Sequence, residues 1–261
     1  MPTATATYAR TVRNESGGPG LLLAHGSGGS VEGNFGAILD GLAATHTVVG
    51  VDYPGTGGTP RAAAPLVLDE LADELVAAAD AEGLDTFAVL GYSLGGNVAV
   101  RIAARYPERV TALVLTASFP YADNQLALIA GVWSELAGRG ENDLLARTLL
   151  PLALSKTVLE GLSPEQLAAV VRDTAASLPP GGGDHAALVA GADLSADLAR
   201  IGVPTLVVAT TEDRLVPLPL QQELAAAVPG ARYAELPTGH LPFAERPEEW
   251  LGLVREFLVN A

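Results

Sequence analysis

A single serine, Ser93, stands among glycines in the segment Gly91-Tyr92-Ser93-Leu94-Gly95. An apolar run precedes this segment and an alanine-rich amphipathic run follows it, so the pattern predicts a strand, a sharp turn and a helix. Such a turn strains the backbone of its central residue and needs neighbours without bulk at Cβ, which the flanking glycines supply. The following helix directs its N-terminal amides toward the exposed hydroxyl. The spacing therefore predicts a nucleophilic serine.

A serine hydroxyl needs a general base to remove its proton, and the base needs an acid that orients it. Two loops that follow later apolar runs supply these groups, with Asp213 in residues 210–217 and His240 in residues 238–250. The carboxyl ends of parallel strands meet at one edge of a sheet, so the three side chains are expected to lie together there. The chain order Ser93, Asp213, His240 is the one expected for this architecture.

The segments around these residues alternate between strand and helix patterns. The predicted strands are residues 3–12, 21–26, 45–53, 87–90, 110–118, 204–210 and 231–237. The predicted helices between them are residues 35–44, 66–81, 94–106, 218–227 and 248–258. This alternation predicts an α/β fold with a mostly parallel sheet that helices cover on both faces.

The alternation stops after residue 118. Residues 119–200 show only helical patterns, for example at 125–136, 144–154 and 164–178. We therefore predict a body made of residues 1–118 and 201–261, and a helical cap or lid of residues 119–200 inserted before the last strands. The glycine-rich stretch 178–183 is expected to be a flexible joint, and His185 is expected to lie in a solvated loop.

The apolar residues of the predicted cap are candidates for substrate contacts. Leu126, Ile129 and Trp133 are expected to form the roof of an acyl pocket, while most other apolar residues of the cap pack it against the body. The cap lacks clusters of Arg or Lys, which argues against a phosphorylated or strongly anionic substrate. A neutral, largely apolar acyl compound is favoured.

Composition excludes several other kinds of site. The chain has no cysteine, and its four histidines lack metal-binding spacing, so we expect no disulfide, no metal and no organic cofactor. A formal net charge of −15, from 30 acidic and 15 basic residues, disfavours nucleic acid and anionic membranes as partners. No signal peptide and no apolar run of bilayer length is visible, so we expect a cytoplasmic protein. Its expected partner is a small-molecule substrate, and we expect a monomer or homodimer.

Four motifs are spread along nearly the whole chain. They are HGSGG at 25–29, DYPGTGGT at 52–59, GYSLGG at 91–96, and the pair EDRLVP and GHLPFAERPEEW near the end. Together they resemble the motifs of α/β-hydrolase-fold proteins. The resemblance implies that Ser93, His240 and Asp213 form a catalytic triad that cleaves an ester, thioester or lactone through an acyl-enzyme, without metal or cofactor.

The resemblance also implies an oxyanion hole. Its donors would be the backbone amides of Ser27 and Leu94, with Gly26 close by. His25 is expected to anchor its loop rather than to contact substrate.

Three alternatives to this interpretation exist within the same fold. Relatives with an aspartate nucleophile, such as epoxide hydrolases and haloalkane dehalogenases, are disfavoured by Ser93 at the turn. Lyases, cyclases and cofactor-free haloperoxidases can use the same triad, so a non-hydrolytic catalyst, for instance in secondary metabolism, stays open. A binding protein that has lost catalysis is disfavoured because it needs no base. For the acid, Asp123 and the solvated Glu212 are weaker candidates than Asp213.

Overall fold

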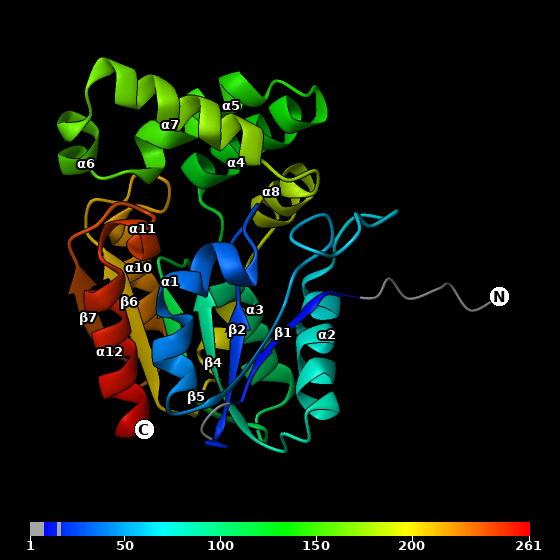
Figure 1. Cartoon of the computed structure of the whole chain (residues 1–261). Helices are drawn as coiled ribbons and strands as arrows, with labels where there is room; N and C mark the ends of the chain where they lie inside the picture. Colours follow the sequence, from blue (N-terminus) through cyan, green and yellow to red (C-terminus); the bar gives the residue numbers. More distant parts are fainter. Residues whose placement is uncertain (1–7, 15–16) are drawn as a thin grey trace.

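In the computed structural model, which describes residues 8–14 and 17–261, seven strands form one sheet (Figure 1). The strands are β1 (Arg10–Arg13), β2 (Gly20–Ala24), β3 (Thr47–Val51), β4 (Phe87–Tyr92), β5 (Val110–Thr116), β6 (Thr205–Thr210) and β7 (Arg232–Leu236). Their order is β1-β3-β2-β4-β5-β6-β7. Only β1 pairs antiparallel, with β3. The predicted mostly parallel α/β sheet is confirmed.

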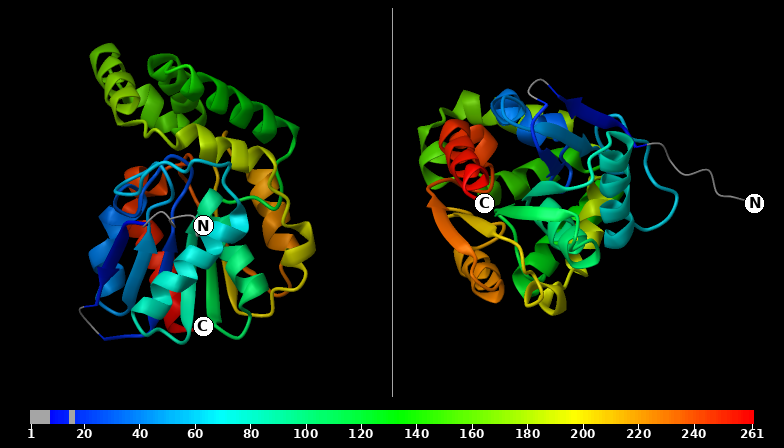
Figure 2. Two further views of the ribbon diagram at one scale, coloured as in Figure 1. Left: turned by 90° about the vertical axis from the view of Figure 1, so that its right-hand side faces the viewer. Right: turned by 90° about the horizontal axis from the view of Figure 1, so that it is seen from below.

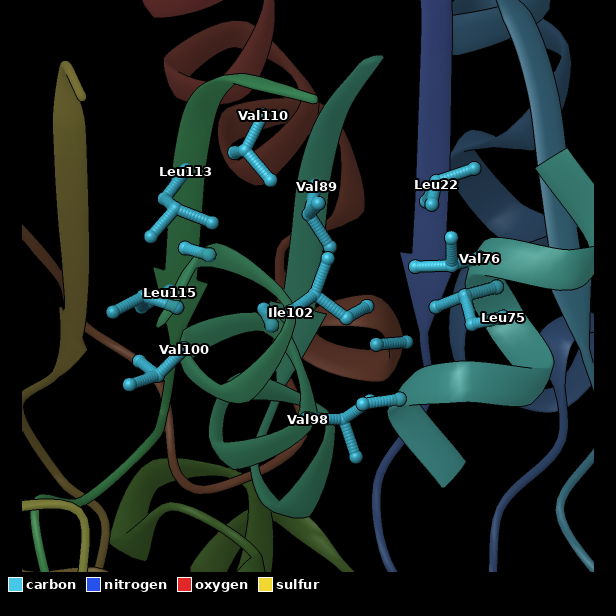
Figure 3. Packing of buried hydrophobic residues seen from close by; sticks show 14 of the residues in the cluster. Leu22, Leu75, Val76, Val89, Val98, Val100, Ile102, Val110, Leu113 and Leu115 are labelled. Atoms are coloured by element: carbon cyan, nitrogen blue, oxygen red, sulfur yellow. The ribbon is translucent and has the colours of Figure 1, made fainter. Parts of the chain in front are cut away.

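Helices cover both faces of the sheet. The first face carries α2 (Leu68–Ala81), α3 (Leu94–Arg105) and α10 (Leu218–Ala227), and the second carries α1 (Val31–Ala43) and α12 (Pro247–Val259). Successive side chains of a strand point to opposite faces, so Leu22 of β2 packs in the first cluster and Leu21 and Leu23 pack in the second. Figure 3 shows part of the first cluster, where residues of α2 and α3 lie against residues of β2, β4 and β5.

Residues 117–204 contain helices and loops but no strand. The helices are α4 (Asn124–Gly138), α5 (Asn142–Ala153), α6 (Lys156–Gly161), α7 (Pro164–Ser177), α8 (Gly182–Ala190) and α9 (Ser195–Leu198). Figure 1 and the left view of Figure 2 show α4 to α7 as a layer over one end of the sheet. A single β-bridge between Tyr121 and Asp193 joins the two ends of this helical segment. The division of the chain into body and cap stays a prediction.

Two elements begin more than two residues away from their predicted starts. α1 begins at Val31 instead of residue 35, because Ser30 caps the helix by accepting a hydrogen bond from the amide of Gly33. β1 begins at Arg10, and Tyr8 and Ala9 of the predicted strand 3–12 are not in a strand; residues 3–7 of that prediction lie outside the described residues. Over the described ranges the longest helix is α4, with 15 residues, and none is long and apolar enough to span a bilayer.

The expectation that His185 lies in a solvated loop is wrong, and the glycines of the predicted joint 178–183 are packed in the interior. Gly181 to Gly183 are buried, α8 begins at Gly182, and His185 is fully buried within that helix. The glycines serve close packing here, since a Cβ on Gly181 would overlap the carbonyl oxygen of Pro54. The local pattern of glycines predicts a loop here. Contacts with residues that are distant in the sequence, which a local pattern does not reveal, explain why the segment is instead the packed start of a helix.

Candidate active site

Ser93 lies at the sharp turn between β4 and α3. Its φ of 53° and ψ of −121° are a backbone conformation that a residue with a side chain seldom adopts. The flanking glycines are required by space, because a Cβ on Gly91 would overlap the carbonyl oxygen of Gly95, and one on Gly95 would overlap that of Ala24. The amide of Ser93 donates to the carbonyl of Thr116 at 2.9 Å, which ties the strained turn to β5.

The three residues predicted from the sequence come together at this turn. His240 Nε2 lies 3.0 Å from Ser93 Oγ, and His240 Nδ1 lies 2.7 Å from Asp213 Oδ2. A carboxylate can only accept, so Nδ1 carries the hydrogen and donates to Asp213. His240 Nε2 is then left to accept the proton of the Ser93 hydroxyl. All three side chains are buried, so the chain of hydrogen bonds is shielded from water.

Both oxygens of the Asp213 carboxylate are fully engaged. Oδ1 accepts from two backbone amides of its own loop, and Oδ2 accepts from three side chains. The donors are the amides of Leu215 and Val216, Thr210 Oγ1, Gln221 Nε2 and His240 Nδ1. These bonds fix the orientation of the carboxylate toward His240.

The two weaker candidates for the acid lie elsewhere. Glu212 accepts a hydrogen bond from the amide of Lys156 at 3.2 Å. Asp123 caps α4 by accepting from the amide of Leu126 at 2.8 Å. Neither carboxylate contacts His240.

Two backbone amides beside Ser93 are free to bind a substrate oxygen. In loop 26–29 the amides of Gly26, Gly28 and Gly29 donate to groups of the protein, whereas that of Ser27 has no partner in the described chain. The amide of Leu94, the first residue of α3, is also without a partner among the described residues. They are the two donors that the resemblance implied. Gly26 lies close by, since a Cβ built on it would be 3.2 Å from that of Ser93.

His25 anchors the start of the same loop. Its Nε2 accepts from the amide of Tyr53 at 2.9 Å, so its Nδ1 carries the hydrogen that donates to the carbonyl of Gly26 at 2.8 Å. Its ring stacks on that of Tyr53, with the centroids 3.9 Å apart. Complete burial, with a smaller contribution from nearby His185, lowers the pKa of His25 to about 3, so the imidazole is neutral.

A cavity of about 240 Å³ opens on Ser93 and His240. Leu126, Ile129 and Trp133 of α4 line it, and no Asp, Glu, Lys or Arg of the described chain does. Further apolar lining residues come from α5, the loop before α8, α8 itself and α11 (Pro242–Glu245), namely Leu149, Leu150, Leu178, Pro179, Val189 and Phe243. Within residues 8–14 and 17–261, no three His, Asp or Glu side chains gather as metal ligands would.

The last turn of α5 binds two loops of the site, the one that carries Asp213 and the one that carries His240. The amide of His240 donates to the carbonyl of Ala153 at 2.6 Å, and that of Arg214 donates to the carbonyl of Leu152 at 3.2 Å. The Arg214 side chain also donates to the carbonyl of Pro151 at 2.9 Å. The last carbonyls of a helix have no partner within it, so they are available for these bonds.

Three buried polar residues that support the site were not predicted as supports. Asn34 accepts from the amide of Gly26, Gln221 donates to Asp213, and His185 accepts from the amide of Gly28. In the sequence, Asn34 and Gln221 are amides on otherwise apolar helix faces, which is the only signal they give. For His185 the glycine-rich context indicated a loop and hid its role.

The family model for the alpha/beta hydrolase fold matches residues 19–247. The chain belongs to the α/β-hydrolase-fold family. It is 34% identical to pyrrolizixenacetamide deacetylase from Xenorhabdus hominickii over 245 residues, which cover 93% of this chain and 92% of the relative. It is 31% identical to the pimeloyl-[acyl-carrier protein] methyl ester esterase of Neisseria meningitidis over 248 residues, which cover 91% and 93%.

Solved structures of this family have the same fold. A hydrolase from Pseudomonas aeruginosa PA01 superposes with a TM-score of 0.84 at 28% identity, covering 99% of this chain and 97% of that one. The sequence-based predictions of the family and of a hydrolase are therefore confirmed for this α/β hydrolase.

Proposed function

We propose that this α/β hydrolase cleaves an ester, thioester or lactone of a small, largely apolar acyl compound. Ser93 is the nucleophile, His240 the general base and acid, and Asp213 the residue that orients His240. The observation that carries the proposal is the continuous hydrogen-bond chain from Asp213 through His240 to Ser93, which ends at an apolar cavity.

The reaction follows from these positions. Ser93 Oγ attacks the substrate carbonyl carbon while His240 Nε2 takes its proton, and the amides of Ser27 and Leu94 donate to the oxygen that becomes negative. The bond to the leaving group then breaks, and His240 gives its proton to the departing atom. Water attacks the acyl-enzyme with His240 again as base, so the acid is released and the Ser93 hydroxyl is restored.

The lining of the cavity supports a neutral and compact acyl group. An apolar cavity of about 150 Å³ in another protein holds benzene, so one of about 240 Å³ has room for a somewhat larger group. Among the described residues, no Lys or Arg lines the cavity to pair with a phosphate or a carboxylate.

An amide is the second candidate bond, because the relative that is 34% identical is named a deacetylase. A triad of this kind can cleave an amide when the base returns its proton to the leaving nitrogen. Paired substrates that share an acetyl group, p-nitrophenyl acetate and p-nitroacetanilide, separate the two activities. We expect turnover of the ester, and a larger kcat/KM for the anilide would favour the amidase.

Labelling with a fluorophosphonate tests the nucleophile. We expect one label, at Ser93, and no label on the Ser93→Ala variant. Ser177→Ala is the matched control, since Ser177 lines the same cavity but donates only to the carbonyl of Thr174. The proposal is wrong if labelling survives in Ser93→Ala, or if the wild-type enzyme turns over neither substrate.

A further inference from the structure

The first turn of α8 is docked onto the body. The amide of Gly181 donates to the carbonyl of Gly55 at 2.9 Å, and the two backbones touch so closely that a Cβ on either glycine would overlap the other. At the protein surface, the carboxylate of Asp184 accepts two hydrogen bonds from the guanidinium of Arg61, at 2.6 and 2.8 Å. The start of α8 is therefore tied to the loop between β3 and α2, and Figure 1 shows α8 beside that loop.

Between these contacts, His185 joins α8 to two loops of the body. Its Nδ1 accepts from the amide of Gly28 at 3.1 Å, and its Nε2 lies 3.0 Å from the carbonyl oxygen of Pro54. One neutral tautomer satisfies both bonds, because Nδ1 must be bare to accept and Nε2 must carry the hydrogen to donate. Burial lowers the pKa of His185, against smaller opposite effects of the hydrogen bond to Pro54 and of the Asp184 charge, which agrees with a neutral imidazole.

The bond to Gly28 decides which amide of loop 26–29 stays free. The amide of Gly26 is taken by Asn34 Oδ1 at 3.0 Å, and that of Gly29 by the carbonyl of Gly26 at 3.1 Å. With the amide of Gly28 taken by His185, the amide of Ser27 is the only one of loop 26–29 without a partner in the described chain. Gly28 has a positive φ of 65°, so its peptide is one that could reorient without its tie to His185.

We propose that His185 is a positioning residue for the oxyanion hole. It reaches from α8 and fixes the Ser27–Gly28 peptide, and this holds the free amide of Ser27 toward the point where the substrate oxygen becomes negative. The inference rests on the proposed function, because it assigns His185 a role in stabilising that oxygen. His185 itself touches neither the substrate nor the reacting atoms.

Two amide substitutions separate the two bonds of His185. In His185→Asn the side-chain oxygen lies near the position of Nδ1 and can still accept from Gly28, but the side chain is too short for Pro54. In His185→Gln the side-chain nitrogen lies near the position of Nε2 and can still donate to Pro54, but no acceptor faces Gly28. Each variant loses one bond, so a merely structural role predicts similar losses in both.

A positioning role predicts an asymmetric result. With p-nitrophenyl acetate, kcat of His185→Gln should fall by about 10- to 100-fold with KM little changed, because a small misplacement of an oxyanion donor is felt in the transition state. His185→Asn should keep most of the wild-type kcat. Arg61→Gln is the control for docking of α8, since it removes an exposed ion pair and leaves both bonds of His185 intact.

Amide NMR of the wild-type enzyme adds a measurement that needs no variant. On phosphonylation of Ser93, the amide resonances of Ser27 and Leu94 should move strongly, because they receive the phosphonyl oxygen. That of Gly28 should move little, because it stays bound to His185.

The outcomes separate this inference from the proposed function. Equal losses of kcat in His185→Asn and His185→Gln, or a dominant shift of the Gly28 amide, would overturn the positioning role while Ser93 is still labelled and the ester still hydrolysed. Failure of the wild-type enzyme to react with the fluorophosphonate would overturn the proposed function and, with it, this inference.

Discussion

Replacing Asp213 by asparagine tests the proposed triad at its most constrained group. Three donors point at Oδ2 and two backbone amides point at Oδ1, so an NH2 group meets donors whichever way the new side chain turns. The two backbone amides, of Leu215 and Val216, cannot turn away. The NH2 group is therefore expected at the Oδ2 position, where it faces His240 Nδ1.

The consequence for His240 sets the size of the effect. An NH2 group at that position favours the tautomer in which Nδ1 accepts and Nε2 carries the hydrogen, and such an imidazole cannot take the proton of Ser93. The corresponding change in a serine protease triad lowers kcat by about 10⁴-fold, or roughly 5 kcal/mol of transition-state stabilisation. We expect a loss of that order here, with KM nearly unchanged.

The assay is the hydrolysis of a fluorogenic short-chain ester, with the rate of Ser93→Ala subtracted as background. Glu212→Gln is the matched control, because it removes the adjacent carboxylate, which binds the amide of Lys156 and not His240. Near-native thermal unfolding of Asp213→Asn would show that the fold is retained. A loss below about tenfold in Asp213→Asn would refute the assignment of the acid, since the tautomer argument allows no such activity.

Three further predictions test the turn, the cavity and the buried His25. Gly95→Ala should lower the free energy of unfolding, measured in urea, by at least about 1–3 kcal/mol, because the added methyl group would overlap backbone atoms. The control Gly131→Ala lies at an open position of α4 and should raise that free energy by about 0.5–1 kcal/mol. Trp133→Ala should shift the preferred acyl length, by roughly fourfold in relative specificity for each methylene newly buried, and the exposed Leu128→Ala should not. His25 has an ordinary pKa of 6.5 and one of about 3 in the fold, so unfolding favours its protonation, and stability falls as the pH drops below 6.5. From pH 7.5 to 5.0 this loss is about 2 kcal/mol, and it should be absent from the pH dependence of His25→Gln.

The parts of the molecule that local chemistry dictates could be predicted from the sequence. The turn at Ser93 needs glycines on both sides whatever the rest of the chain does, so its motif is visible in five consecutive residues. The buried strands are apolar on both faces, and the structure places β2 to β6 within one or two residues of most predicted limits. α10 has the predicted bounds, Leu218–Ala227.

The parts that depend on contacts between distant segments could not be predicted. Gly181 and His185 indicated a loop because their neighbours are glycines, and only the closeness of Gly55 and Pro54 explains why those glycines are required. The engagement of Gln221 with Asp213 is equally invisible, because an amide in an apolar helix face does not reveal its partner.

The helical segment between β5 and β6 lines the cavity and also binds the loops that carry the proposed catalytic residues. α8 holds the loop of Ser27 through His185, and the end of α5 holds the loops of Asp213 and His240 through its last carbonyls. These bonds reach residues that support the proposed chemistry, whereas Leu126 and Ile129 of α4 are apolar side chains that line the cavity. Substitutions along the segment should therefore act differently by position. Those on the cavity face of α4 should alter the choice of acyl group, and those at the end of α5 or the start of α8 should lower kcat for every substrate alike.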